Sequence, residues 1–268
     1  MVRVLPSLLT LGNLICGFAA IFYASREPDI IVLGHWSPFQ LAASLIFIGM
    51  IFDALDGRVA RITRQTSELG EQLDSMADMV TFGVAPAFIL IELIDIGAPF
   101  FGSARFDAIS DRAVLTIAAV YVACCALRLA RFNIEVDNPE ESDHLSFKGL
   151  PSPAAAGTVA SLVLLHQLLL GDHPAAAHYT GFGLMLIGLL TAIGMVSTMR
   201  YPHVMNRYLR GRAPFHYVAL FVIALLLLLN IPQISLALGF SIYALSRPTT
   251  AAIQKLTRRQ PNTPPAQD

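Results

Sequence analysis

The sequence predicts an all-α, polytopic membrane protein, a bundle of about eight transmembrane helices with its functional site on the cytoplasmic side. Hydrophobic residues make up 55% of the 268 residues and charged residues only 14%, and the mean hydropathy is +0.61. These values lie outside the usual range of soluble globular domains. The hydrophobic residues also fall into runs of about 20, the length that a helix needs to cross a bilayer. We therefore expect lipid to surround most of the chain.

Eight apolar runs bounded by charges or prolines are the candidate helices. They cover residues 7–25, 38–62, 75–98, 112–134, 152–171, 178–199, 213–230 and 231–246. The first run follows Arg3 directly and has no clear small-residue cleavage site, so we expect a retained helix rather than a removable secretion signal. The last run is short and contains Gly239, which makes the ends of the final two helices the hardest to place.

The basic residues predict the orientation of this bundle, because lysine and arginine accumulate at the cytoplasmic ends of membrane helices. With eight crossings and the N-terminus inside, 15 of the 18 basic residues fall on the cytoplasmic side. Only Arg26, Arg105 and Arg112 fall outside. We therefore expect both termini in the cytoplasm.

The chain shows no soluble domain and no clear internal repeat. Residues 1–247 are predicted to form one integral membrane domain, and residues 248–268 a basic, then proline-rich cytoplasmic tail that is disordered at its end. The three cysteines lie within apolar runs and indicate neither a disulfide framework nor a CxxC metal site. A net charge of −1 gives no sign of a nucleic-acid-binding surface.

Four aspartates stand where apolar residues would be expected. Asp53 and Asp56 share a face near the end of the second run, and Asp74 and Asp78 share a face at the start of the third. The short connection over residues 63–72 makes these helices antiparallel neighbours, so the four carboxylates should meet near the cytoplasmic boundary. Carboxylates at membrane depth are costly without a partner, and clustered carboxylate oxygens suit hard divalent cations such as Mg²⁺ or Mn²⁺. The pattern favours a two-metal site.

The aspartates have two other interpretations. They would form a solvated charge network with Arg58, Arg61 and Arg64, or they would line the pathway of a cation transporter or channel. Four carboxylates with this phasing are a poor match to the first reading. The second is disfavoured because the carboxylates gather at one face and the second half of the chain carries no matching set. The pattern therefore favours an enzyme.

The spacing around the aspartates is itself specific. Asp53, Asp56, Gly57, Ala60, Arg61, Gly70, Asp74 and Asp78 reproduce the pattern D-x-x-D-G-x-x-A-R-x(8)-G-x-x-x-D-x-x-x-D in full. In these residues the chain resembles the CDP-alcohol phosphatidyltransferase family. The resemblance narrows towards the membrane-embedded phosphatidylserine synthases through Thr10-x-x-Asn13 with Gly17, RLARFN at 128–133, GLPSPAAAG at 149–157 and MVST leading to Tyr201.

The resemblance implies a reaction. A phosphatidyl group would pass from CDP-diacylglycerol to the hydroxyl of L-serine with release of CMP, in phospholipid biosynthesis. The aspartates would hold two divalent cations, Mg²⁺ or Mn²⁺, and Asp78 would also act as general base. The resemblance further implies a homodimer in a bacterial inner or plasma membrane. Because the aspartate motif serves the CDP half of the substrate, another acceptor such as glycerol phosphate or inositol phosphate, or an ether-lipid donor, stays an alternative.

Substrate contacts are expected from a wider set of residues. The candidates for the CDP-lipid are Gly57, Ala60, Arg61, Gly70, Thr10 and Asn13, and those for serine are Arg128, Arg131 and Lys148. Small residues would let the nucleotide approach the backbone, and basic groups would bind phosphate or the serine carboxylate. Each also has a structural reading: close helix packing for the small residues, interhelical hydrogen bonds for Thr10 and Asn13, and topology for the basic residues.

Overall fold

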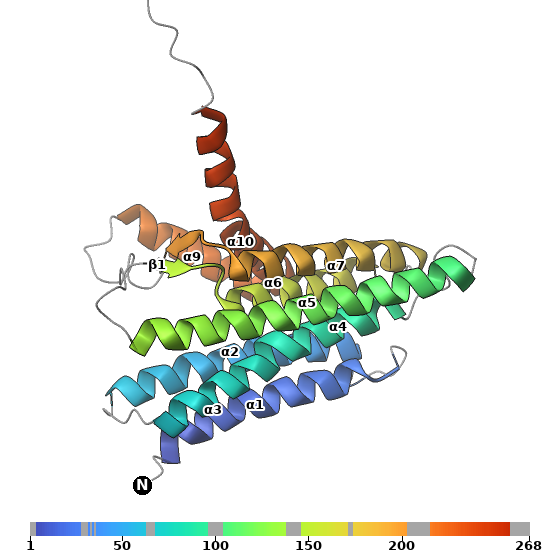
Figure 1. The fold of residues 1–268 in the computed structure, drawn as a ribbon. Coiled ribbons are helices and arrows are strands. Elements are labelled where there is room, and N and C mark those ends of the chain that lie inside the picture. Colours follow the sequence, from blue (N-terminus) through green and yellow to red (C-terminus); the bar gives the residue numbers. More distant parts are fainter. Residues whose placement is uncertain are drawn as a thin grey trace, which may run out of the picture.

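The computed structural model is almost entirely helical (Figure 1). It describes residues 4–27, 32, 34, 36–62, 68–95, 104–137, 146–170, 174–202 and 215–257. The elements are α1 (Val4–Ala24), α2 (Pro38–Ile62), α3 (Glu68–Asp78), the π-helix η1 (Met79–Val84), α4 (Ala85–Asp95), α5 (Ala104–Asp137), β1 (Ser146–Lys148), α6 (Ser152–Leu170), α7 (Pro174–Val196), β2 (Arg200–Pro202), α9 (Phe215–Asn230) and α10 (Pro232–Thr257). Since α3, η1 and α4 are continuous, the described helices form eight rods, one for each predicted run.

Several of these rods have the dimensions of membrane spans. Within the described residues, five helices are long and apolar enough to cross a bilayer: Leu5–Ala24, Pro38–Ala60, Glu68–Ile94, Asp111–Ile134 and Ser152–Leu169. The described part of α7 adds a shorter apolar helix, Thr180–Val196. In Figure 1, α1 to α7 lie side by side in roughly parallel rods, while the end of α10 projects from the bundle. The chain is an integral membrane protein.

Helix α6 lies at the centre of the bundle because its side chains are small. On this helix, Ala155, Ala156 and Ala160 are fully buried, and only 1% of the surface of Val159 is exposed. Small side chains let helix backbones approach closely, which is how helices gain packing energy in lipid, where no hydrophobic effect drives them together. The alanine-rich GLPSPAAAG segment thus begins the helix around which α2, α7 and α10 pack.

The start of α2 agrees with its prediction because a capping box defines it. Ser37 lies just before Pro38, and Ser37 Oγ accepts from the Gln40 N–H at 3.2 Å while Gln40 Oε1 accepts from the Ser37 N–H at 3.0 Å. This reciprocal pair satisfies N–H groups that a helix start leaves without partners, and proline is well suited to the first helical position. Ser37 Oγ also donates to Gln167 Oε1 at 3.0 Å, which ties the start of α2 to α6.

The third rod begins earlier than predicted, at Glu68 rather than at residue 75. Glu68 and Glu71 occupy its first turn, where negative side chains are favoured by the helix dipole. The rod then changes to π-helix over Met79–Val84 before it continues as α4. A π-segment inside an α-helix often marks a functional site, and this one begins directly after Asp78.

A small antiparallel sheet closes one end of the bundle. Strands β1 and β2 pair Phe147 with Tyr201 and Lys148 with Arg200. Gly149 follows β1 with a φ of +85°, and a Cβ there would lie 2.2 Å from the Met195 carbonyl oxygen. Only glycine fits this left-handed position without a clash. The sheet joins the connection before α6 to the end of α7.

Helix α10 corrects the prediction for the last run. The expected helix covered 231–246, but α10 continues through Gly239 and Pro248 to Thr257. A proline within a helix has no N–H for the carbonyl four residues earlier, which here is that of Ala244. The Tyr201 hydroxyl donates to this carbonyl at 3.0 Å. A residue far away in sequence therefore replaces the lost hydrogen bond.

Candidate active site

The four aspartates converge at the end of the bundle where α2 finishes and α3 begins. Carboxylate oxygens of Asp53, Asp56 and Asp74 all lie within 4.8 Å of one another. Asp78, one turn further along α3, is buried and interacts electrostatically with both Asp53 and Asp74. The antiparallel arrangement of α2 and α3 thus brings together the residues that the spacing predicted to meet.

The cluster has the properties of a cation site. Asp56 Oδ2 and Asp74 Oδ1 are buried and have no hydrogen-bond partner among the described residues. Buried carboxylate oxygens without partners are costly unless a cation neutralises them. The donor atoms are all oxygens, the ligand type that Mg²⁺ and Mn²⁺ prefer. These residues therefore fit a hard divalent cation.

Asn13 on α1 fixes the orientation of Asp78. Its Nδ2 donates to Asp78 Oδ1 at 3.0 Å, and the Asn13 side chain is fully buried. Thr81, in the π-helical segment, donates from Oγ1 to the Asn13 carbonyl at 2.9 Å. Two hydrogen bonds between α1 and the third rod thus hold the Asp78 carboxylate at the cluster.

Two glycines make this contact possible. A Cβ on Gly17 would lie 2.4 Å from Thr81 Oγ1, and a Cβ on Gly49 would lie 2.7 Å from Thr81 Cγ2 and 2.9 Å from Asn13 Oδ1. A larger residue at Gly17 would push Thr81 away from α1, and one at Gly49 would push it away from α2. Helices α1, α2 and η1 can meet around Thr81 only because these positions lack side chains.

The π-helical segment is held from its other side by α5. Tyr121 is fully buried and donates its hydroxyl to the Phe82 carbonyl at 3.3 Å. A π-turn leaves carbonyls outside the regular α-helical pattern, and in lipid each needs a partner from the protein. Further along α5, Asn133 Nδ2 donates to Ser75 Oγ at 2.9 Å, next to Asp74.

Gly57 is an exception among the motif's small residues. A Cβ there would meet nothing within 4 Å, unlike those on Gly17 and Gly49. Close helix packing therefore does not explain this glycine, and its face of α2 is open beside Asp53 and Asp56. Ala60 and Gly70 are half-buried near the same helix ends. The side chain of Arg61 lies outside the described part of the chain.

Thr10 lies against the cluster from α1. It is buried, donates from Oγ1 to the Pro6 carbonyl at 3.1 Å, and its hydroxyl also faces the Asp56 carboxyl group. Thr10 and Asn13 thus approach the aspartates from the same helix, as their spacing of three residues predicts. Both lie within the site rather than only between helices.

The three basic residues expected to bind serine have different surroundings. Arg128 is buried near Asp53, and its guanidinium donates to the Leu150 carbonyl at 3.0 Å and to Ser152 Oγ at 3.3 Å. It therefore also anchors the start of α6. Arg131 is half-buried one turn later, and Lys148 lies in β1 with its side chain outside the described part.

Several site residues were not expected from the sequence. Thr81, Gly49 and Tyr121 take part in positioning Asp78, yet each stands in an apolar run with no motif of its own. One signal was available: a threonine three residues after an intramembrane aspartate falls on the same helix face. The π-turn that places it against α1 has no such signal.

The geometry agrees with comparisons to known proteins. Residues 3–194 match the CDP-alcohol phosphatidyltransferase family. This chain belongs to that family. Similar proteins include those of Helicobacter pylori strain J99 (38% identity, 74% of this chain and 71% of the relative), Bacillus subtilis strain 168 (32%, 74% and 90%) and Methanocaldococcus jannaschii (33%, 75% and 80%). Each is named CDP-diacylglycerol–serine O-phosphatidyltransferase.

Membership in the CDP-alcohol phosphatidyltransferase family makes the chain an enzyme and confirms the family expected from the aspartate motif. The matched region contains α1 to α6 and nearly all of α7, and hence every site residue described above. Helices α9 and α10 lie beyond it.

Proposed function

We propose that this enzyme is a CDP-diacylglycerol–serine O-phosphatidyltransferase, which transfers a phosphatidyl group to the hydroxyl of L-serine and releases CMP. The observation that carries the proposal is the cluster of the half-buried Asp53 and Asp74 with the buried Asp56, beside an oriented Asp78. The names of the relatives support serine as the acceptor, because the proteins from all three organisms carry the same name.

The four aspartates are proposed to hold two divalent cations, Mg²⁺ or Mn²⁺. Such ions, when bound, neutralise the diphosphate of the lipid substrate and stabilise the charge that develops on the departing CMP. The unpartnered oxygens of Asp56 and Asp74 support this assignment.

Asp78 is proposed to remove the proton from the serine hydroxyl, because an alcohol is a poor nucleophile until it is deprotonated. The Asn13 side chain occupies Oδ1 of Asp78 with a hydrogen bond. The other oxygen, Oδ2, is then the atom that would accept the proton. The attack breaks the bond between the lipid-side phosphate and the CMP oxygen, so serine replaces CMP on the phosphatidyl group.

The substrates would lie on two sides of the aspartates. The CDP group would lie over the open face at Gly57, with Ala60, Gly70 and Thr10 nearby and Arg61 on a phosphate oxygen. L-Serine would approach from α5, with its carboxylate towards Arg131, Lys148 or the remaining donors of Arg128. Two of the Arg128 donors already bind the start of α6, which favours a positioning role for that residue.

The membrane arrangement is part of the same proposal. We place both termini and the aspartate end of the bundle on the cytoplasmic side of a bacterial inner or plasma membrane, with eight crossings, because the basic residues gather at that end. We also propose a homodimer, a membrane domain over residues 1–247 and a cytoplasmic tail over 248–268. In this division the end of α10 projects into the cytoplasm as the first part of the tail.

The direct test is release of CMP from CDP-diacylglycerol by the purified protein. We expect release that depends on L-serine and on Mg²⁺ or Mn²⁺, and that Asp78→Asn abolishes. Asp111→Asn, a change at an exposed carboxylate on α5, is the matched control and should keep full activity. Release with glycerol phosphate or inositol phosphate, but not with serine, would contradict the proposed acceptor.

A further inference from the structure

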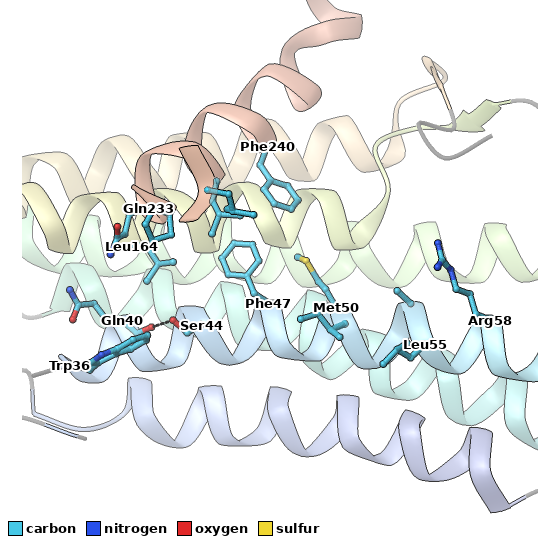
Figure 2. A pocket seen from close by; sticks show the side chains of 15 residues that line it. Trp36, Gln40, Ser44, Phe47, Met50, Leu55, Arg58, Leu164, Gln233 and Phe240 are labelled. Carbon is cyan, nitrogen blue, oxygen red and sulfur yellow. Dashed lines mark hydrogen bonds between the residues drawn. The ribbon is translucent and has the colours of Figure 1, made fainter. Parts of the chain in front are cut away.

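A pocket of about 800 Å³ lies along α2 on the side away from α1 (Figure 2). We name it the lateral pocket. Its opposite wall consists of residues from α9 and α10, among them Leu228, Leu236 and Phe240, and α6 contributes Leu164. The α9 and α10 wall follows the family region, which ends at residue 194. The lateral pocket is therefore built partly from helices that lie beyond the matched family region.

The lining of the lateral pocket is polar at both ends and apolar between them, with Gln40, Ser44 and Gln233 at one end and Arg58 at the other. Phe47, Met50 and Leu55 follow α2 towards the aspartate end, where Arg58 completes the lining. Figure 2 shows these side chains in this order along α2. An apolar channel that ends at a guanidinium matches a lipid whose tail lies in the channel and whose phosphate lies at the arginine.

Gly57 lies between the lateral pocket and the aspartates on the surface of α2. It lies four residues after Asp53 and three residues after Ala54, which lines the pocket. On a helix it therefore has the aspartate as a neighbour on one side and the pocket residue on the other. A Cβ on Gly57 would meet nothing within 4 Å. A diphosphate could cross this open position and join a tail in the lateral pocket to the aspartates.

An aromatic pair divides the lateral pocket at the depth of one leaflet. The ring centroids of Phe47 and Phe240 lie 5.6 Å apart, on opposite walls midway along the pocket (Figure 2). Phe47 is eleven residues before Arg58, which on a helix is about 16 Å. This is close to half of the roughly 30 Å hydrocarbon thickness. An acyl chain about 16 Å long whose first carbon lies at Arg58 would reach the two rings near its end.

The position of Phe240 depends on the glycine that ends the GLPSPAAAG segment. A Cβ on Gly157 would lie 2.3 Å from Phe240 Cε1. The absent side chain on α6 therefore provides the space that Phe240 occupies. The contact with Phe240 therefore explains a glycine at residue 157 without any role for it in catalysis.

We infer that the lateral pocket, from Arg58 to the Phe47–Phe240 pair, holds an acyl chain of the CDP-activated lipid, and that this pair sets the length of chain the enzyme accepts. The inference rests on the proposed function for its substrate. It adds a specificity site that the C-terminal helix α10 supplies. Burying one more methylene group favours binding about fourfold, so a change in accepted length should be readily measured.

The test compares kcat/KM for dioctanoyl, dipalmitoyl and diarachidoyl CDP-diacylglycerol in two variants of one residue. Phe240→Ala should raise the preference for diarachidoyl over dipalmitoyl substrate by about tenfold, and Phe240→Trp should lower it. The dioctanoyl substrate is too short to reach the ring, so its kcat/KM should stay unchanged in both. Leu238→Ala and Leu238→Trp, on the exposed side of α10, are matched controls that should keep the wild-type preference.

A second measurement does not depend on turnover. A dipalmitoyl substrate with a photoreactive diazirine at its chain end should label peptides that contain Phe47 or Phe240. Labelling confined to the outer surface around Leu238 and Ile242, or equal effects of Phe240→Ala on all chain lengths, would overturn the inference. If the wild-type protein transferred a phosphatidyl group to no alcohol, the proposed function would be refuted instead. The labelling would still report whether the acyl chain occupies the lateral pocket.

Discussion

At the scale of single residues, the site depends on how one carboxylate is held. Asp78 sits between an aspartate cluster that repels its charge and an asparagine that stabilises it. Because Asn13 is fully buried, its hydrogen bond to Asp78 is shielded from water and directs the carboxylate. The Thr81 hydroxyl then ties the third rod to the Asn13 carbonyl. The missing side chains at Gly17 and Gly49 leave room for this contact.

Replacing Asn13 by alanine should therefore lower kcat rather than weaken substrate binding. A hydrogen bond to a charged group contributes about 1.5–3 kcal/mol, so we expect a loss of roughly ten- to a hundredfold in kcat with KM for the CDP-lipid nearly unchanged. Steady-state kinetics in detergent micelles provide the measurement, and Ser25→Ala at the exposed end of α1 is the control. A rise in KM alone would mean that Asn13 contacts the CDP-lipid instead.

Gly149 makes a prediction about stability. Alanine there would take a left-handed φ of +85° and place its Cβ 2.2 Å from the Met195 carbonyl oxygen. We expect Gly149→Ala to reduce the free energy of unfolding by about 3 kcal/mol or more. Gly183→Ala is the matched control, since a Cβ there meets nothing within 4 Å. Equal thermal midpoints for the two variants would show that the sheet tolerates movement at this position.

At the scale of elements, α10 continues through a proline because the sheet supplies a hydrogen-bond donor. Burial raises the pKa of the Tyr201 hydroxyl, with the Arg247 charge acting in the opposite direction, so Tyr201 stays protonated and able to donate at neutral pH. Its ring also lies 5.7 Å from that of Tyr243 on α10. The MVST segment thus leads to a contact that joins α7, the sheet and the C-terminal helix.

A double-mutant cycle tests this contact. Tyr201→Phe leaves the Ala244 carbonyl without its donor and should cost about 1–2 kcal/mol of stability. Pro248→Ala restores an N–H four residues after that carbonyl, so it should recover more stability in the Tyr201→Phe background than in the wild type, by about 1 kcal/mol. Unfolding of each variant in the same detergent supplies the four free energies. Strictly additive changes in the free energy of unfolding would show that Tyr201 does not compensate for Pro248.

At the scale of the whole molecule, the sequence predicted what local patterns determine. Apolar length located the eight rods, and the capping box at Ser37 made the start of α2 agree with its prediction. The aspartates were predicted together because helix periodicity and a short connection suffice to bring them to one end. These features depend on residues that are close in sequence.

The features that the sequence did not reveal depend on contacts between distant residues. The π-turn at Met79–Val84 requires α1 and α5 to supply partners for it, and α10 passes Pro248 only because Tyr201 reaches Ala244. Proline predicted a helix end, since a proline taken alone removes a hydrogen bond. The lateral pocket was also not predicted, because its walls come from three separated parts of the chain.

We propose that the aspartate cluster is the metal centre of phosphatidyl transfer. The measurement that tests it most directly is titration of Mn²⁺ into the purified, metal-depleted protein, followed by electron paramagnetic resonance. We expect saturable binding of two ions, with Asp56→Asn and Asp74→Asn each weakening it and abolishing CMP release, while Asp111→Asn leaves both unchanged. Mn²⁺ binding that is the same in the wild type, Asp56→Asn and Asp74→Asn would contradict the assignment of the metals to this cluster.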